Sequence, residues 1–110
     1  MRSLEQAMQA MRDRAEATNL AARVQATFQI EVAGDGGGVF HLVLCDGQAT
    51  VGQGPAARPD CVIFTFAENW WDLIDGKADP RQLVTSGRMR IRGDMGLASQ
   101  LASLLPGGRQ

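Results

Sequence analysis

The sequence predicts an α+β domain built on five strands, most of them antiparallel. Three observations lead to this prediction. Four segments between residues 24 and 66 alternate apolar and polar side chains, glycine-containing turns join the first three, and helical spacing appears before and after this block. Alternation with a period of two marks a strand, and a period near 3.6 marks a helix. Strands and helices grouped in this way are typical of α+β layers.

The first predicted helix covers residues 4–17 and continues or restarts over 19–22. Ser3 followed by Gln6 is the pattern of a capping box, which marks a helix start. Apolar side chains then recur at helical spacing: Leu4, Ala7, Met8, Met11 and Ala15. The opposite side is charged, so the helix is expected to lay one face on the rest of the domain.

The strands of the central block are predicted over residues 24–32, 39–45, 48–52 and 61–66. In the first strand Phe28 belongs to the apolar side, and in the second Phe40 does. The run GDGGG at 34–38 forms a turn. Asp46-Gly47 is a strong two-residue hairpin signal. The hairpins make most of the sheet antiparallel.

Two short helices are predicted over residues 68–75 and 80–84, followed by a strand over 88–92. Asp79-Pro80 supplies an N-cap and a proline at the first helical position. Asp94 then caps a last helix, and Pro106 ends its stripe of leucines.

Composition limits the classes of function. The 110 residues are enough for one domain, which we expect to span residues 1–110. With 11 basic and 12 acidic residues the net charge is −1, which argues against nucleic acid as a partner. No apolar run approaches the roughly 18 residues of a membrane span. The first residues lack the core of a signal peptide, and two cysteines fit a reducing compartment. We therefore expect a cytoplasmic protein.

Catalytic chemistry has little support in the sequence. His41 is the only histidine, and it alternates with the apolar residues of its strand. Cys45 and Cys61 form neither a CxxC pair nor a set with metal-ligand spacing. The GDGGG turn lacks the lysine and hydroxyl residue of a phosphate-binding loop. We expect no enzyme activity, no metal and no cofactor.

An ordered series of residues runs through the second half of the chain: Asp60, Trp70, Leu73, Gly76-Lys77, Pro80, Gly87 and the stretch GDMGLASQL at 93–101. Upstream, Phe28, Phe40 and Asp46-Gly47 also fit. No single piece is specific, but the ordered series resembles the sterol carrier protein-2 family, in a small, stand-alone, bacterial-type form, over roughly residues 15–105. The resemblance implies a five-stranded sheet with helices on one face and an apolar tunnel between them. It also implies a non-catalytic domain that binds sterols, fatty acids, fatty acyl-CoAs or other lipids, such as isoprenoids.

The predicted lipid site lines this tunnel from both layers, with Phe28, Ile30, Phe40, Leu42, Trp71, Ile74, Leu101, Leu104 and Leu105. Met8 and Met11 would close it, because unbranched thioethers adapt to varied tails. From spacing alone, these leucines and methionines pack equally well as ordinary core, and both interpretations stay open. Trp70 and Trp71 diverge by about 100° on a helix. One is therefore expected in the core and the other at the tunnel mouth or on the surface.

A second hypothesis gives the same fold a different role. The resemblance also allows an accessory or scaffold domain that acts through protein partners, for example in bacterial quinone biosynthesis. Lipid binding predicts a ligand in the tunnel and at most transient contact with membranes. The scaffold hypothesis predicts a co-purifying protein instead.

The outer face of the sheet raises a question of assembly. Three arginines of the last predicted strand point away from the helices: Arg88, Arg90 and Arg92. Three roles are open for them: a solvated face, a contact with an acidic partner or lipid headgroups, or protection of a sheet edge against pairing with another strand. In the fourth strand, the resemblance implies that Cys61, Ile63 and Thr65 face the helices. It then leaves Val62, Phe64 and Phe66 on the outer face. Such an apolar patch favours a homodimer that buries it. The alternative is a bulge after Pro59 that reverses the parity of this strand.

Overall fold

The computed structural model describes residues 3–102. Its elements in chain order are α1 (Leu4–Ala17), the 3₁₀ turn η1 (Leu20–Ala22), β1 (Ala26–Ala33), β2 (Gly38–Cys45), β3 (Gln48–Gln53), β4 (Cys61–Phe66), α2 (Ala67–Ile74), α3 (Pro80–Thr85), β5 (Met89–Gly93) and α4 (Met95–Ala102). The predicted order of helices and strands is confirmed.

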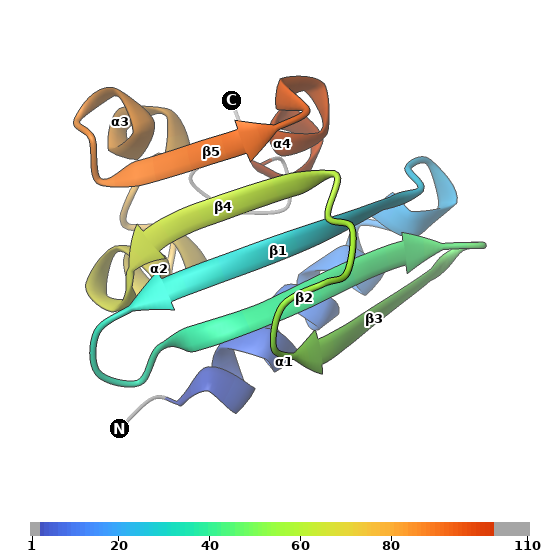
Figure 1. Cartoon of the computed structure of the whole chain (residues 1–110), viewed down its shortest axis with the longest axis horizontal. Helices are drawn as coiled ribbons and strands as arrows, with labels where there is room; N and C mark the ends of the chain where they lie inside the picture. Colours follow the sequence, from blue (N-terminus) through green and yellow to red (C-terminus); the bar gives the residue numbers. More distant parts are fainter. Residues whose placement is uncertain (1–2, 103–110) are drawn as a thin grey trace.

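The five strands form one mixed sheet in the order β3-β2-β1-β4-β5 (Figure 1). β1 and β4 are parallel, and every other neighbouring pair is antiparallel. The β2–β3 hairpin turns at Asp46 and Gly47, which both have positive φ, at 52° and 78°. Two such residues are the requirement of a type I′ turn, so the hairpin signal in the sequence is confirmed.

All the helices lie on one face of the sheet, behind the strands in Figure 1. α1 packs against β2 and β3, α2 against β1 and β4, and α4 against β4 and β5, while α3 lies beside β5. The three central strands, β2, β1 and β4, bury every second residue beneath these helices, with strict alternation along β1. The α+β class with helices on one face is therefore confirmed.

The parity of β4 decides which side chains face the helices. Cys61, Ile63 and Thr65 are buried, whereas Phe64 is half-buried and Phe66 is 46% exposed on the other face. The pairing of β4 with β1 and β5 is continuous through Ile63. The alternative of a bulge that reverses the parity is therefore wrong, because no register shift interrupts the strand.

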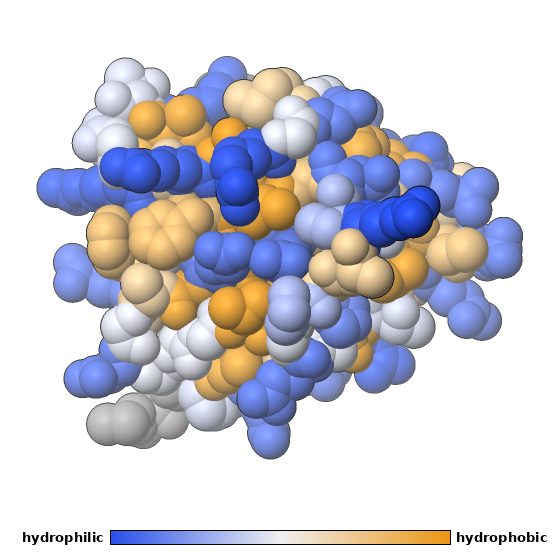
Figure 2. Space-filling view, in the orientation of Figure 1, coloured by the Kyte–Doolittle hydropathy of each residue, from blue (hydrophilic) through white to orange (hydrophobic). Residues whose placement is uncertain are grey.

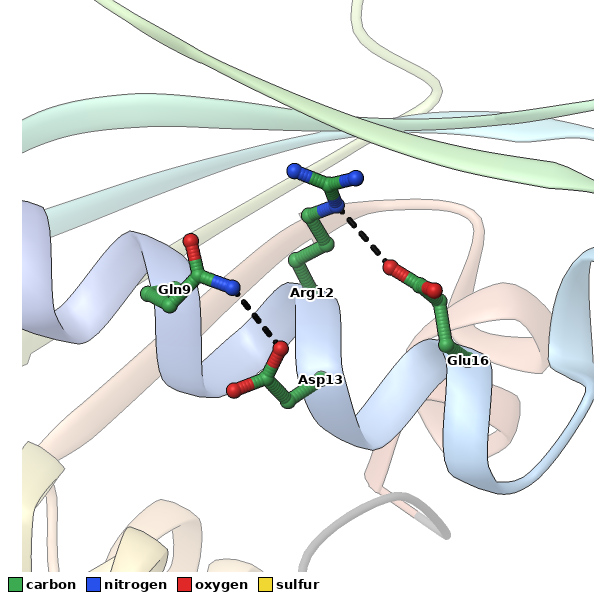
Figure 3. A network of polar contacts seen from close by, with 4 residues as sticks. All are labelled: Gln9, Arg12, Asp13 and Glu16. Carbon is green, nitrogen blue, oxygen red and sulfur yellow. Dashed lines mark hydrogen bonds and ion pairs between the residues drawn. The ribbon is translucent and has the colours of Figure 1, made fainter.

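The first helix has the predicted capping box. Ser3 Oγ accepts a hydrogen bond from the Gln6 backbone, and Gln6 Oε1 accepts one from the Ser3 backbone. Its outer face carries two further contacts, from Gln9 to Asp13 and from Arg12 to Glu16 (Figure 3). The inner face buries alanine and methionine: Ala7, Met11 and Ala15.

The centre of the core is aromatic. Trp70 and Phe40 are both fully buried and meet edge to face, with ring centroids 5.9 Å apart and planes at 72°. Trp71 is only half-buried. The prediction that one of the two tryptophans belongs to the core is confirmed, and the buried one is Trp70. Among the described residues no helix is long and apolar enough to cross a membrane.

Candidate functional site

A small apolar cavity lies between the sheet and the helices beneath β4 and β5. Its volume is about 30 Å³, which is about the space of one water molecule. Every element around it contributes an inward side chain: Met11 from α1, Ile63 from β4, Trp70 from α2, Pro80 from α3, Met89 and Ile91 from β5, and Ala98, Leu101 and Ala102 from α4. Its side chains are hydrocarbon, thioether or indole, so the cavity accommodates an apolar group.

An open groove adjoins this cavity on the surface. It has a volume of about 450 Å³ and runs between α3, β5 and α4. Four residues line both spaces: Pro80, Ile91, Ala98 and Ala102. The groove also carries Val84, 39% exposed, and Met95, 58% exposed. The cavity and the groove therefore adjoin across these four side chains.

One cation lies in the groove. Arg81 lines it, and its Nε is 3.9 Å from Asp79 Oδ1. Asp79 is already occupied as the N-cap of α3, where its side chain accepts from the Arg81 backbone N–H. The ion pair is long and its arginine side chain is 69% exposed, so the pair contributes little binding energy. The guanidinium is therefore available to an anionic group.

One residue that lines the cavity, Trp70, carries a buried polar atom without a partner. Trp70 is 1% exposed, and its indole Nε1 has no hydrogen-bond partner among residues 3–102. Buried indole N–H groups usually find an acceptor.

The structure brings two residues of the predicted tunnel lining, Met11 and Leu101, to the cavity wall. Phe28, Ile30, Phe40 and Leu42 are fully buried elsewhere in the core. Met8, Trp71 and Ile74 are partly buried and pack against that core. Leu104 and Leu105 lie outside the described residues. The role of all these residues in lipid contact stays a prediction, as does a continuous tunnel.

Sequence reasoning missed most of the cavity wall: Ile63, Trp70, Pro80, Met89, Ile91, Ala98 and Ala102. Two signals pointed to part of this set. Met89 and Ile91 alternate with the arginines and so had to face the helices. Ala98 lies three positions before Leu101 and four before Ala102, so it neighbours both on the helix surface, and the small alanine side chains leave space.

Groups that could do acid–base or metal chemistry are scattered. His41 Nδ1 lies 3.0 Å from the Gly54 carbonyl on the outer face of β2. Cys45 is exposed and Cys61 is buried. Burial raises the pKa of the Cys61 thiol, and the carboxylates of Asp94 and Asp60 raise it further. Within residues 3–102 no three histidine, cysteine or carboxylate side chains cluster to hold a metal.

A second pocket, of about 390 Å³, lies between α2 and α3. Its wall mixes two carboxylates with two cations: Asp72, Asp79, Lys77 and Arg88. A wall that carries both positive and negative side chains favours neither an anionic nor a cationic ligand. The apolar cavity with its groove is therefore the site that defines a ligand class.

Comparison with known proteins gives a consistent result. The sequence model of the SCP-2 sterol transfer family matches residues 4–106. A curated relative, hydroxysteroid dehydrogenase-like protein 2 of Rattus norvegicus, is 34% identical over 82 residues, which are 74% of this chain and 16% of that protein. The chain therefore spans less than a fifth of that relative.

Two solved structures share the fold. The sterol carrier protein domain 2 of Helicoverpa armigera has a TM-score of 0.77 and 27% identity, and covers 94% of this chain and 87% of its own. The palmitated SCP2L2 of Aedes aegypti has a TM-score of 0.68 and 21% identity, over 87% of this chain and 91% of its own.

Proposed function

Because the chain belongs to the SCP-2 sterol transfer family, we propose that it binds and transfers a lipid without catalysing a reaction. The observation that carries this proposal is the apolar groove that adjoins a small apolar cavity across four shared residues. The ligand classes are sterols, fatty acids, fatty acyl-CoAs and isoprenoid-type lipids. The palmitated state named for the Aedes aegypti relative supports an acyl chain among them.

The cavity must enlarge to admit a tail. Its present volume of about 30 Å³ is that of a single small group. Met11 and Met89 line it, and unbranched thioethers rearrange readily. Ala98 and Ala102 of α4 form the wall toward the groove. A tail therefore enters by displacing α4 from β4 and β5, which joins cavity and groove into the expected tunnel.

Uptake is passive. Burial of apolar surface contributes about 25 cal/mol per Å², so a long tail supplies enough free energy to offset the displacement of a short helix. An anionic headgroup stays in the groove near Arg81, in contact with water. The exposed side chains of Val84 and Met95 at the groove make transient contact with a membrane surface during transfer, in the cytoplasm.

The outer face of the sheet forms a homodimer in this proposal. Phe64 lies between Glu31 on β1 and Arg90 on β5 in one cross-strand row. Together with Val62 and Arg92 these residues border a shallow groove of about 250 Å³. Figure 2 shows apolar side chains over β4 directly beside strongly hydrophilic ones over β5.

The row is self-complementary. Neighbouring strands are evenly spaced at about 4.8 Å. A two-fold axis that runs parallel to β4 at Phe64 therefore places each phenylalanine on its copy. The same axis brings Glu31 opposite the partner's Arg90, twice. One patch thus serves both copies, as an isologous interface requires.

Two experiments test lipid binding. Native mass spectrometry with lipid extraction of the purified protein is expected to find a bound lipid. Titration with a fluorescent fatty acid is expected to saturate at one ligand per chain. If no lipid co-purifies and no titration saturates, lipid binding is wrong. A specific co-purifying protein together with that result would support the scaffold hypothesis instead.

A further inference from the structure

The polar pocket between α2 and α3 is separate from the apolar groove. α3 borders both spaces but presents different residues to each: Asp79, Gln82, Leu83 and Ser86 to the pocket, and Pro80, Arg81, Val84 and Thr85 to the groove. Each set repeats at the spacing of one helix face. The two spaces therefore lie on different sides of α3, and a molecule in the pocket does not occupy the groove.

A buried amide lines this pocket. Asn69 is 8% exposed and belongs to the pocket wall. Its side chain makes no hydrogen bond within residues 3–102, yet its amide atoms are not fully covered, because Trp70 Nε1 is the one polar side-chain atom in that range that is both covered and without a partner. Buried polar groups are usually hydrogen-bonded. The Asn69 amide is therefore accessible and free to bond a molecule in the pocket.

The charged side chains of the pocket do not neutralise one another. Asp79 is occupied as the N-cap of α3 and by its long pair with Arg81. Asp72, which is half-buried, and the exposed Lys77 and Arg88 lie within 4.0 Å of no opposite charge among the described residues. The pocket of about 390 Å³ therefore offers one free carboxylate and two free cations.

A wall that favours neither a simple anion nor a simple cation can pair both ends of a molecule that carries the two charges. We infer that this pocket binds an aminoalkyl phosphate, a small molecule with an ammonium group and a phosphate monoester. The ammonium pairs with Asp72, and the Asn69 oxygen, one turn away on the same face of α2, accepts from it. Lys77 and Arg88 bind the phosphate. A monoester carries about −1.5 to −2 charges at pH 7, so it matches two cations better than a singly charged carboxylate or phosphodiester does.

Water-soluble ligands test the pocket without involving lipid. The wild type is titrated in a calorimeter with O-phosphoethanolamine, and separately with inorganic phosphate and with ethanolamine, which each supply one end of the ligand. We expect O-phosphoethanolamine to bind at one molecule per chain and about tenfold more tightly than either half, because the second charged contact is gained only by the complete molecule. Equal affinity for phosphate and O-phosphoethanolamine, or no binding, would overturn the inference. Saturable fatty-acid binding in the same protein would then leave the lipid function standing.

A phosphodiester distinguishes the free monoester from a lipid headgroup. Glycerophosphoethanolamine keeps the ammonium but carries a single phosphate charge, as the headgroup of an aminophospholipid does. We expect it to bind at least about threefold more weakly than the monoester, because one unit of charge is missing. Equal or tighter binding of the diester would overturn the monoester and identify a lipid headgroup as the ligand.

Two variants separate the two ends of the ligand. Asp72→Asn is expected to lower the affinity for O-phosphoethanolamine to that for phosphate, without weakening phosphate itself. Arg88→Gln is expected to weaken both ligands. The matched control is Asp13→Asn, which removes an exposed carboxylate from the outer face of α1 and should leave both affinities unchanged. An Asp72→Asn protein that still prefers O-phosphoethanolamine over phosphate would refute the assignment.

A measurement on the wild type guards against a variant that fails to fold. The chain has two asparagines, Asn19 and Asn69, so selective nitrogen-15 labelling of asparagine gives two side-chain amide pairs. Asn19→Gly assigns them, because Asn19 is exposed and has a positive φ of 57° that glycine adopts readily. O-phosphoethanolamine is expected to shift the Asn69 pair and leave the Asn19 pair in place. An unmoved Asn69 pair at saturating ligand would show that the molecule binds elsewhere.

Discussion

The guanidinium of Arg14 in α1 donates a hydrogen bond from Nη2 to the carbonyl oxygen of Ile74, the last residue of α2, at 2.8 Å. The last carbonyls of a helix have no partner within it, and this end of the helix attracts cations. The bond is part-buried and joins residues that are 60 positions apart in the chain. It therefore fixes α1 to the helix that carries Trp70.

Loss of this bond should destabilise the fold measurably. We expect Arg14→Met to lower the free energy of unfolding by about 1–2 kcal/mol, because a charged donor is lost and a carbonyl is left partly buried. Urea unfolding measures the difference. The control is Arg12→Met, which removes the pair with Glu16 in Figure 3, whose side chains are 48% and 56% exposed. That change should cost less than about 0.5 kcal/mol. Equal losses in both variants would contradict the role of Arg14.

Asp60 joins three strands at one end of the sheet. Its Oδ2 accepts from the Thr27 backbone at 2.8 Å, its own N–H donates to the Thr27 carbonyl, and its carbonyl accepts from the Asp94 backbone. We expect Asp60→Ala to cost about 1–2 kcal/mol of unfolding free energy, because the Thr27 N–H loses its acceptor. Asp60→Asn keeps a carbonyl oxygen and should cost about half as much. Thermal and urea unfolding of the three proteins check this order, and an asparagine variant as unstable as the alanine one would refute it.

The buried thiol of Cys61 should make the fold sensitive to alkaline pH. Burial, Asp94 and Asp60 raise its pKa in the folded protein. A thiol with a raised folded pKa stabilises the fold fully below its ordinary pKa and loses that contribution as pH rises through the folded pKa. We therefore expect the unfolding free energy to fall above about pH 8.5, by up to about 1.4 kcal/mol per pH unit.

The chain has no tyrosine, so few other groups titrate in this range. Urea unfolding between pH 7.5 and pH 10.5 measures the slope. Cys61→Ala should remove most of it, and Cys45→Ser, which replaces the exposed thiol, should keep it. A slope that survives in Cys61→Ala would assign the effect to another group.

The fold was predictable because local signals agreed with each other. The Asp46-Gly47 turn and the alternation of β1 and β2 fix the hairpins, and Asp79-Pro80 fixes the start of α3. Several boundaries differ from the prediction by one residue, and the start of β1 differs by two: the strand begins at Ala26, not Val24. The Val24 backbone N–H bonds to the carbonyl of Leu20, the first residue of the 3₁₀ turn, and is therefore not available to a neighbouring strand. Whether the turn or the strand takes this N–H depends on the three-dimensional geometry, which residue types alone do not encode.

The cavity was less predictable. Alternation showed that Phe28 and Phe40 face the helices, but not that Trp70 would fill the space between Phe40 and the cavity. Which inward side chains touch a void depends on where each helix crosses the sheet. Sequence spacing says which face a residue belongs to, and leaves its position along the interface undefined.

Ala98 offers a direct test of the route into the cavity. It is buried and lines both the cavity and the groove. We expect Ala98→Leu to weaken fatty-acid binding by about tenfold or more, because the larger side chain fills the junction that a tail must cross. The control is Ala17→Leu, at an exposed position at the end of α1. Fluorescent fatty-acid titration and circular dichroism measure binding and fold. Unchanged affinity in a folded Ala98→Leu protein would rule out this route.

The last prediction concerns the outer face of the sheet. Phe64 packs edge to face on Phe66, with ring centroids 5.5 Å apart, and both lie on the side away from the helices. We expect the wild type to be a dimer in light scattering and Phe64→Glu to be a folded monomer. Because Phe64 is only half-buried within one chain, the glutamate is not forced into the core. A monomeric wild type, or a Phe64→Glu protein that unfolds, would show that this face does not form the interface.

Charge exchange tests the orientation of the dimer. With the two-fold axis parallel to β4, Glu31 faces the partner's Arg90. Arg90→Glu should therefore set like charges against each other and raise the dissociation constant of the dimer by at least about tenfold. Adding Glu31→Arg to the same chain restores opposite charges across the axis and should restore the dimer. An axis perpendicular to the strands would instead place Glu31 opposite its own copy. The single exchange would then bring no new repulsion between Glu31 and Arg90 across the interface, and the double exchange would rescue nothing. Sedimentation equilibrium of the wild type, the single variant and the double variant distinguishes the two orientations.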